Sequence, residues 1–204
     1  MYRLGYEDER NLARALLRAC GMSEADADTA GAVITHSDFT GVYSHGTSRL
    51  TGYLNLFRKG AYNPKPEIRI IKDEPSVLEL DCDNALGVVT VNRAFDLLLP
   101  KARSHGIAVC TGRRSSNIGC AAYYGWRAAE NDVIAIVCCN TYLSMAPYGG
   151  AERLIGTNPI AVGVPTHDEY PIVMDISTSG VAMGKVKASA REGRTHPDGW
   201  ANDS

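Results

Sequence analysis

The residues best suited to chemistry lie in one short stretch, YSHGTSRL at positions 43–50. His45 can give or take a proton near neutral pH, and Arg49 can grip a carboxylate with two parallel hydrogen bonds. If a helix begins at Ser44, the two side chains share one face, one turn apart. The pair would then suit a small 2-oxo or 2-hydroxy acid. A start at Thr47 weakens this argument, and an exposed histidine without a role is the alternative.

A metal site is the second possibility for the same region. His36, Asp38 and His45 supply ligand types within ten residues. His36 and Asp38 are two positions apart, however, and point away from each other if the segment is helical. No H-E-x-x-H-like motif occurs. We therefore predict no catalytic metal.

Nucleotide-binding motifs are incomplete in this chain. No G-x-G-x-x-G follows an expected strand, so the Rossmann fingerprint is absent. The stretch STSGVAMGKV imitates a P-loop, but Gly180 and Gly184 are one residue too close and Val186 cannot ligate magnesium. The hydroxyl-rich turn at 177–179 could still hold a phosphate through backbone N–H groups. A polar turn that caps a helix is the equal alternative.

A long loop rich in small residues, positions 140–159, joins two apolar segments. Loops of this length inside a compact domain are often functional. A surface Ω-loop without a ligand is the alternative, and composition favours it.

The elements that must position these residues change in type along the chain. Apolar spacing predicts helices at 7–19, 24–36 and 47–58. Ser23 and Asp26 form a capping box for the second helix, and Lys59-Gly60 ends the third. Pro64 and Pro66 then mark a linker.

The rest of the chain mixes strands and helices. Alternating residues in EIRII and SVLEL predict paired strands, and a helix follows at 87–104 that Pro100 must kink or end. We then expect GIAVCTG as a strand, CAAYYGWRAAE as a helix, DVIAIVCC as a buried strand, and NPIAVGVP and PIVMDI as two more strands. The predicted class is α/β (α+β), with a helical segment at 1–62 and a mixed-sheet domain at 63–204.

Composition limits the function further. The 204 residues are 45% hydrophobic and carry a net charge of −2. The sequence therefore has no excess of positive charge that would bind the phosphates of a nucleic acid. Neither a signal-peptide core nor an apolar run long enough for a membrane occurs. The six cysteines lack C-x-x-C spacing, and Cys138 and Cys139 read as buried free thiols. We expect a cytoplasmic protein with no nucleic-acid or membrane partner.

Five segments in order resemble one family. They are GVYSHGTSRLTGY, SSNIGCAAYYGWRAAE, APYGGAERLIGTNPIAVGVP, MDISTSGVAMGKV and PDGWANDS. Together they are similar to the malate/L-lactate dehydrogenase family of NAD(P)-dependent oxidoreductases that lack a Rossmann fold. The resemblance implies a homodimer with a mixed-sheet, non-Rossmann cofactor domain. It implies hydride transfer between NAD or NADP and a small carboxylated substrate.

The resemblance also implies roles for single residues. His45 would transfer a proton to the substrate oxygen, Arg49 would bind its carboxylate, and Tyr53 would line the same pocket. The implied cofactor contacts are Asn140, Thr141, Met174, Asp175, Ile176, Ser177, Thr178 and Ser179.

Two departures from the family pattern bear on activity. The family pattern S-N-H-x-G carries a histidine where this chain has Asn117, and asparagine cannot shuttle a proton. Either His45 performs the acid–base step alone or activity is impaired. Family members also run well past residue 204, so a catalytically silent fragment is the leading alternative. A hydrolase with His45 in a metal site is a third hypothesis.

Overall fold

The structure is a computed structural model that describes residues 4–181, 183–191, 193–195 and 200. The chain divides into two compact units, Met1–Cys120 and Ala121–Ser204. The expected junction near residue 62 falls inside the first unit. That residues 1–62 form the substrate and dimer side stays a prediction.

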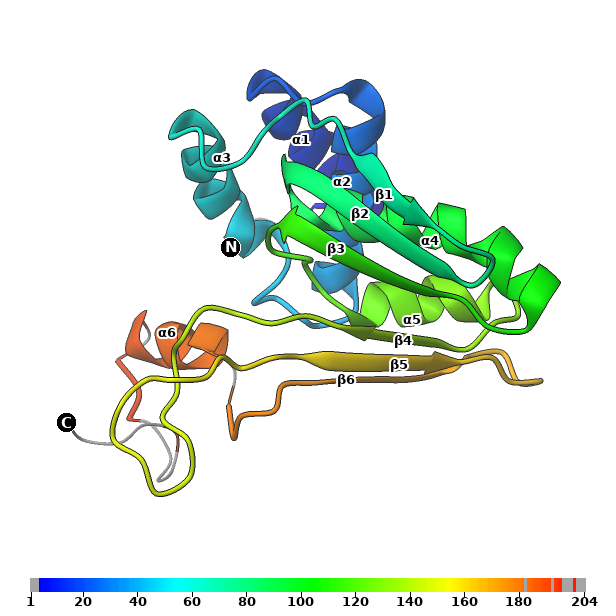
Figure 1. Cartoon of the computed structure of the whole chain (residues 1–204). Helices are drawn as coiled ribbons and strands as arrows, with labels where there is room; N and C mark the ends of the chain where they lie inside the picture. Colours follow the sequence, from blue (N-terminus) through cyan, green and yellow to red (C-terminus); the bar gives the residue numbers. More distant parts are fainter. Residues whose placement is uncertain (1–3, 182, 192, 196–199, 201–204) are drawn as a thin grey trace. The chain divides into compact units, whose positions relative to one another are not determined.

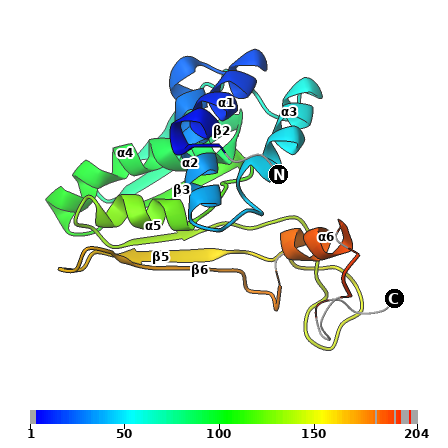
Figure 2. The same cartoon turned by 180° about the vertical axis from the view of Figure 1, so that it is seen from behind.

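The first unit begins with helices α1 (Tyr6–Ala19) and α2 (Glu24–Phe39), which lie side by side in Figure 2. The predicted cap of α2 is confirmed, because the Asp26 N–H donates a 3.1 Å hydrogen bond to Ser23 Oγ. The helix continues three residues beyond the expected end. Gly31 allows the close approach of α1, since a Cβ there would lie 3.2 Å from the carbonyl oxygen of Arg10.

The third predicted helix begins later than expected. Thr47–Arg49 form a single 3₁₀ turn (η1), and the α-helix α3 spans Leu50–Arg58. His45 lies in the irregular turn before both. The shared-face argument for His45 and Arg49 therefore does not hold, because the two residues do not belong to one α-helix. The predicted end is confirmed, with Lys59 as the cap residue and Gly60 at a φ of 70°.

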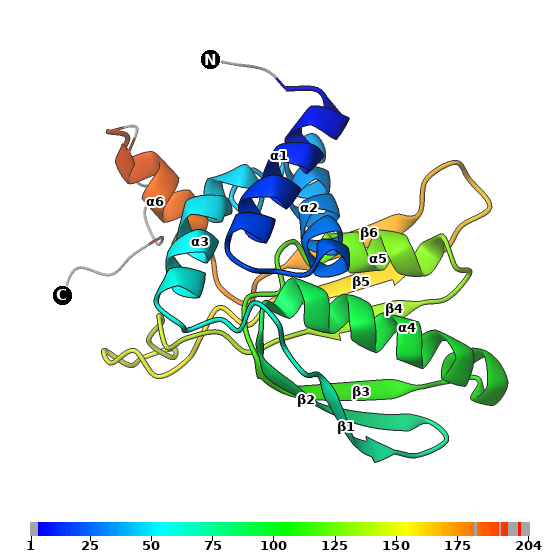
Figure 3. The same cartoon turned by 90° about the horizontal axis from the view of Figure 1, so that it is seen from above.

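A three-stranded sheet completes the first unit, in the order β1-β2-β3. Strands β1 (Arg69–Asp73) and β2 (Val77–Ala85) pair antiparallel, as predicted. Strand β3 (Val109–Ser115) pairs parallel to β2, after a crossover through α4 (Gly87–His105). Helix α4 runs along one face of this sheet (Figures 1 and 3).

The core between α4 and the sheet is small and apolar. It contains three buried residues of β2: Leu78, Leu80 and Cys82. Leu97 and Leu98 of α4 pack against these side chains. Pro100 lies inside α4 and does not end it. A proline removes one backbone hydrogen bond, and the packed apolar face holds the helix together around it.

The second unit contains an antiparallel sheet of β4 (Ala135–Cys138), β5 (Ile160–Val164) and β6 (Ile172–Ile176). Helix α5 (Ala122–Ala129) packs on one face of it, and α6 spans Met183–Arg191. The backbones of α5 and β5 are in direct contact, because a Cβ on Gly163 of β5 would lie 2.3 Å from Gly125 Cα of α5.

The prediction that β4 is a buried strand is wrong. Ile136 is 71% exposed and Cys138 is exposed, while Cys139 is half-buried. Helix α5 covers one face of the sheet only, and the residues that alternate away from it face outward. Within the described ranges, no helix is long and apolar enough to cross a membrane.

Candidate active site

The turn that carries His45 is held by short local hydrogen bonds. The His45 N–H donates to the Val42 carbonyl at 2.9 Å, and Ser48 Oγ donates to the Tyr43 carbonyl at 2.6 Å. Ser44 Oγ lies 2.9 Å from His45 Nδ1, which fixes one edge of the imidazole ring. His45 is half-buried.

Asp38 anchors this turn from the end of α2. Its Oδ2 accepts hydrogen bonds from the Thr47 backbone N–H and from Thr47 Oγ1, both at 2.7 Å. Gly46 leaves the space for it, because a Cβ there would lie 2.0 Å from Asp38 Oδ1. Asp38 therefore stabilises the turn through its hydrogen bonds to Thr47. Among the described residues, no three His, Cys, Asp or Glu side chains lie close enough together to hold a metal ion.

Arg49, Tyr53 and Asn117 come together in the first unit. The Arg49 guanidinium lies 5.9 Å from the centre of the Tyr53 ring. Tyr53 Oη donates a 2.6 Å hydrogen bond to Asn117 Oδ1, which also accepts the Gly119 N–H at 3.0 Å. A backbone N–H can only donate, so this contact fixes which end of the Asn117 amide is oxygen.

The loop that presents Asn117 is clamped to the start of α4. Ser116 Oγ donates to the Ala85 carbonyl at 2.9 Å and accepts the Gly87 N–H at 3.1 Å. A Cβ on Gly87 would lie 2.3 Å from the Ser116 carbonyl oxygen. The position of Asn117 therefore depends on the β2–α4 junction.

Tyr53 is almost fully enclosed, with 3% of its surface exposed. Burial raises the pKa of Tyr53 to about 12, although the neighbouring Arg49 charge acts in the opposite direction. The phenol is therefore a stable hydrogen-bond donor at physiological pH.

The second unit gathers the predicted cofactor residues at one end of its sheet. Cys138, Ile160 and Ile176 pair across the three strands, so the end of β4, the start of β5 and the end of β6 meet there. Thr141 Oγ1 accepts the Thr157 N–H at 2.8 Å. The Thr178 N–H donates to the Thr157 carbonyl at 2.9 Å.

Neighbouring residues reinforce this edge. The Thr141 N–H donates to Asn158 Oδ1 at 3.0 Å, and Ser177 Oγ lies 3.0 Å from Ser179 Oγ. Asn140 lies in the same segment, between β4 and Thr141. The structure thus brings Thr141, Ser177, Thr178 and Ser179 to one edge.

The other three predicted cofactor residues have different surroundings. Met174 and Ile176 are 40% and 50% exposed on the outer face of β6. Asp175 faces the other way, and its Oδ2 accepts the Ala122 N–H at 2.8 Å at the start of α5. Asp175 therefore holds the helix to the sheet.

Sequence reasoning missed Asp38 as an anchor, and it missed Thr157 and Asn158 as the partners of Thr141. Asn158 has a φ of 32°, and the Gly156-Thr157-Asn158-Pro159 run in the long loop was the available signal for a tight turn.

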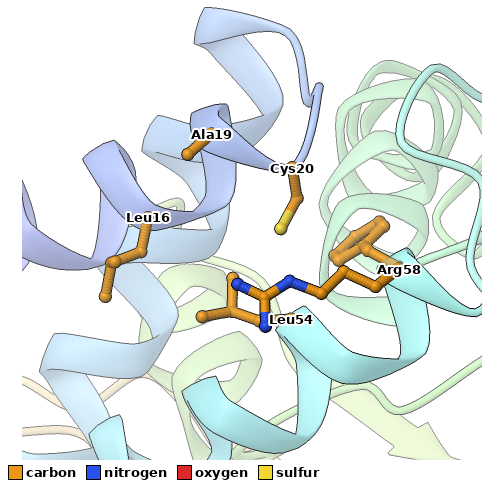
Figure 4. Close-up of a pocket in the computed structure, with 6 residues that line it drawn as sticks. Leu16, Ala19, Cys20, Leu54 and Arg58 are labelled. Atoms are coloured by element: carbon orange, nitrogen blue, oxygen red, sulfur yellow. The ribbon is translucent and has the colours of Figure 1, made fainter.

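A separate groove lies between α1 and α3 (Figure 4). Its lining is mainly apolar, with the Arg58 side chain reaching across it and Cys20 above. It shares no lining residue with the Arg49, Tyr53 and Asn117 cluster. Its residues are Leu16, Ala19, Cys20, Leu54, Phe57 and Arg58.

Known proteins resemble this chain over nearly its whole length. Malate dehydrogenase of Pyrococcus horikoshii is 38% identical over 98% of the chain and 58% of its own length. The crystal structure of malate dehydrogenase from Entamoeba histolytica superposes with a TM-score of 0.95 at 28% identity. That match covers 98% of this chain and 55% of the other.

Two relatives are named for their cofactors. Ureidoglycolate dehydrogenase (NAD(+)) of Escherichia coli K12 is 32% identical over 90% of this chain and 52% of its own length. (2R)-3-sulfolactate dehydrogenase (NADP(+)) of Chromohalobacter salexigens is 32% identical over 98% of this chain and 60% of its own length. This chain therefore spans little more than half the length of the relatives it matches.

The family profile of malate/L-lactate dehydrogenases matches residues 4–204, which include both the Arg49, Tyr53 and Asn117 cluster and the polar sheet edge. The mixed α/β fold agrees with the solved structures of that family. The chain therefore belongs to the malate/L-lactate dehydrogenase family.

Proposed function

We propose that this protein transfers a hydride between NAD or NADP and a small 2-hydroxy or 2-oxo carboxylic acid of the malate or lactate type. The observation that carries the proposal is the Arg49, Tyr53 and Asn117 cluster in a chain of this family. The active form is proposed to be a cytoplasmic homodimer.

Arg49 is proposed to bind the substrate carboxylate. A guanidinium forms two parallel hydrogen bonds with a carboxylate, which fixes the orientation of the acid as well as its position. The Arg49 guanidinium lies over the Tyr53 ring, and Tyr53 is itself held by its hydrogen bond to Asn117. These two contacts are proposed to fix the position of Arg49. Binding energy from the carboxylate then orients the neighbouring carbonyl or hydroxyl.

His45 is proposed to move the proton. Its Nδ1 lies against Ser44 Oγ, so we assign the transfer to Nε2, which protonates the substrate oxygen on reduction and removes its proton on oxidation. Asn117 is proposed to orient the same oxygen through its amide, since it cannot carry a proton.

The proposed cofactor edge consists of Asn140, Thr141 and the segment Met174–Ser179. Its small hydroxyl side chains fit a dinucleotide, because hydroxyl groups at the end of a strand can donate to a pyrophosphate. When bound, the nicotinamide ring would supply or accept the hydride. Of this segment, we expect Ser177, Thr178 and Ser179 to contact the cofactor and Asp175 to act through α5.

The test is an assay of NADH and NADPH oxidation with a panel of 2-oxo acids. Arg49→Lys should raise KM for the acid by about 10- to 100-fold, because lysine cannot form the bidentate contact. Arg58→Lys, at the last residue of α3 and outside the cluster, is the matched control. Equal effects of the two substitutions would overturn the role of Arg49.

The second candidate is a catalytically silent chain, favoured by the departure from the family pattern at Asn117. Nicotinamide fluorescence separates the two candidates. Saturable NADH or NADPH binding supports the enzyme, whereas a folded chain that binds neither supports the silent chain.

A further inference from the structure

The sheet of the second unit has one covered face and one open face. Figure 1 shows α5 on one side of β4, β5 and β6. Val173 of β6 points to that side, since a Cβ on Gly125 of α5 would lie 3.1 Å from Val173 Cγ1. Asp175 points the same way, through its hydrogen bond from the Ala122 N–H. Successive strand residues point to opposite faces, so the residues that alternate with these two form the open face.

The open face is apolar at every position, and its residues pair in rows across the three strands. The row nearest the proposed cofactor edge consists of Cys138, Ile160 and Ile176. The next row consists of Ile136, Val162 and Met174. The last row consists of Val164 and Ile172, with Ile134 immediately before β4.

These apolar side chains are accessible to solvent in the single chain. Ile134 and Ile172 are each 66% exposed, and Ile136 is 71% exposed. An antiparallel sheet with one solvated face normally carries polar residues on that face, whereas apolar residues on both faces are typical of a sheet covered on both sides. The open face therefore has the composition of a buried surface.

The size of the open face fits the centre of a protein interface. Three strands at a spacing of about 4.8 Å, with five residues at about 3.4 Å each, give a face of about 14 by 17 Å. A standard interface buries about 800 Å² of accessible surface on each partner, with an apolar core inside a polar rim. The open face can supply that core, and the surface around it can supply the rim.

The chemistry of the open face limits what can cover it. It contains no charged and no aromatic residue. A nucleic acid requires basic side chains, and binding at a membrane surface commonly uses Lys, Arg and Trp. The complementary surface is another flat, uncharged, apolar face, and a second copy of this chain supplies one.

We propose that two copies of this protein pack their open faces against each other about a two-fold axis. Such an axis buries the same residues on both copies. Two sheets can pack face to face at about 10 Å, with their strands about 30° apart. The second copy then covers the apolar side chains of β4. The inference rests on the proposed function, because it names the surface through which the proposed homodimer forms.

Sedimentation equilibrium of the full chain over a wide range of concentration tests this interface. Ile136→Lys should raise the dissociation constant of the dimer by about 100-fold or more, because an ammonium group would be buried between the sheets. Ile107→Lys is the matched control, since Ile107 is 72% exposed but belongs to the first unit, and it should leave the constant unchanged.

A second variant guards against a local effect of Ile136→Lys. Ile172→Lys places the charge on β6, at the opposite edge strand of the same face, and should weaken the dimer similarly. Both isoleucines are exposed in the single chain, so we expect both variants to fold, and circular dichroism checks this.

Cys138 reports on the open face without any substitution, because its thiol is exposed there. Iodoacetamide should alkylate Cys138 about tenfold more slowly once the protein is concentrated well above the dissociation constant. The rate at Cys20, which belongs to the first unit, should not change. In Ile136→Lys, Cys138 should react fast throughout the range in which the wild type is protected. Mass spectrometry of the peptides identifies each thiol.

Two results would overturn the inference. One is a dimer that persists in both lysine variants with Cys138 still reactive, and the other is a wild-type chain that sediments as a monomer at every concentration. Nicotinamide fluorescence separates this inference from the proposed function. A dimer with a protected Cys138 that binds neither NADH nor NADPH would refute the proposed function and leave the interface intact. Turnover by a monomer would refute the interface alone.

Discussion

Tyr53 and Asn117 are 64 residues apart in the chain and are joined by a 2.6 Å hydrogen bond from the phenol to Asn117 Oδ1. The bond ties α3 to the loop after β3, at the position where the family pattern has histidine. Asn117 makes this structural contact and has no group that can carry a proton.

Asn117→His should raise the rate of 2-oxo acid reduction by about 10²-fold if this position carries protons in the family. The new Nδ1 would lie near the present Oδ1, but it has one lone pair for two donors, Tyr53 Oη and the Gly119 N–H. We therefore expect a loss of about 1 kcal/mol in the free energy of unfolding. Steady-state kinetics and urea unfolding measure the two effects.

Asn117→Gln is the control for this substitution, because it changes the side chain without adding a proton carrier. A folded Asn117→His variant with no gain in rate would mean that His45 suffices for the acid–base step or that another part of the protein limits turnover.

Tyr53→Phe should change how stability depends on alkaline pH. The raised pKa of Tyr53 means that the unfolded chain loses the phenol proton first, near pH 10, so the wild type loses stability between pH 10 and about 12. That loss is at most about 2–3 kcal/mol, and Tyr53→Phe should not show it. At pH 8 the variant should instead be less stable by about 1 kcal/mol, because one hydrogen bond is gone.

Urea unfolding at pH 8 and pH 11 tests this prediction. Tyr43→Phe, at a residue that is 69% exposed, is the control and should behave like the wild type at both values. The same alkaline loss in wild type and Tyr53→Phe would show that Tyr53 is not the group responsible.

Local signals in the sequence predicted the elements well. Ser23 and Asp26 placed the start of α2, and the alternating residues of β1 and β2 predicted their pairing, because both signals act over a few residues. The start of α3 was predicted too early. Asp38 and Thr47, nine residues apart in the sequence, are hydrogen-bonded, and this contact holds the segment before Leu50 in a turn instead of a helix. The Tyr53–Asn117 bond has no local signal at all.

Burial was the least predictable property of the second unit. The apolar run around β4 suggested a strand covered on both faces, but α5 covers one face, and Ile136 and Cys138 lie on the other. An apolar pattern shows that a face can be buried and does not show which neighbour covers it. Likewise, Asp175 was grouped with the cofactor loop by position, whereas its contact with Ala122 depends on how α5 packs.

Gly163→Ala should destabilise the second unit strongly. The added Cβ would lie 2.3 Å from both Gly125 Cα and its carbonyl oxygen, and neither backbone can move without separating α5 from β5. We expect a loss of about 3 kcal/mol or more. Both tryptophans, Trp126 and Trp200, belong to this unit, so their fluorescence reports its unfolding directly.

Gly52→Ala is the matched control. This glycine lies in α3 with no atom within 4 Å of an added Cβ, so alanine should stabilise the helix by about 0.5–1 kcal/mol. A Gly163→Ala variant with an unchanged fluorescence midpoint would contradict the close contact between α5 and β5.

Gly156→Ala should weaken cofactor binding through the polar sheet edge. The added Cβ would lie 2.3 Å from Thr141 Oγ1 and 2.7 Å from Asn158 Oδ1, so it would displace the hydrogen bonds that join β4 to β5 at this edge. We expect Kd for NADH or NADPH to rise about tenfold or more, the equivalent of losing one or two hydrogen bonds. Gly149→Ala, in the same loop with open space around it, is the control for a change elsewhere in the loop, although its φ of 75° adds backbone strain that Gly156→Ala lacks. An equal loss of affinity in the two variants would place the effect in the loop as a whole, whereas unchanged affinity in Gly156→Ala would remove this edge from the cofactor site.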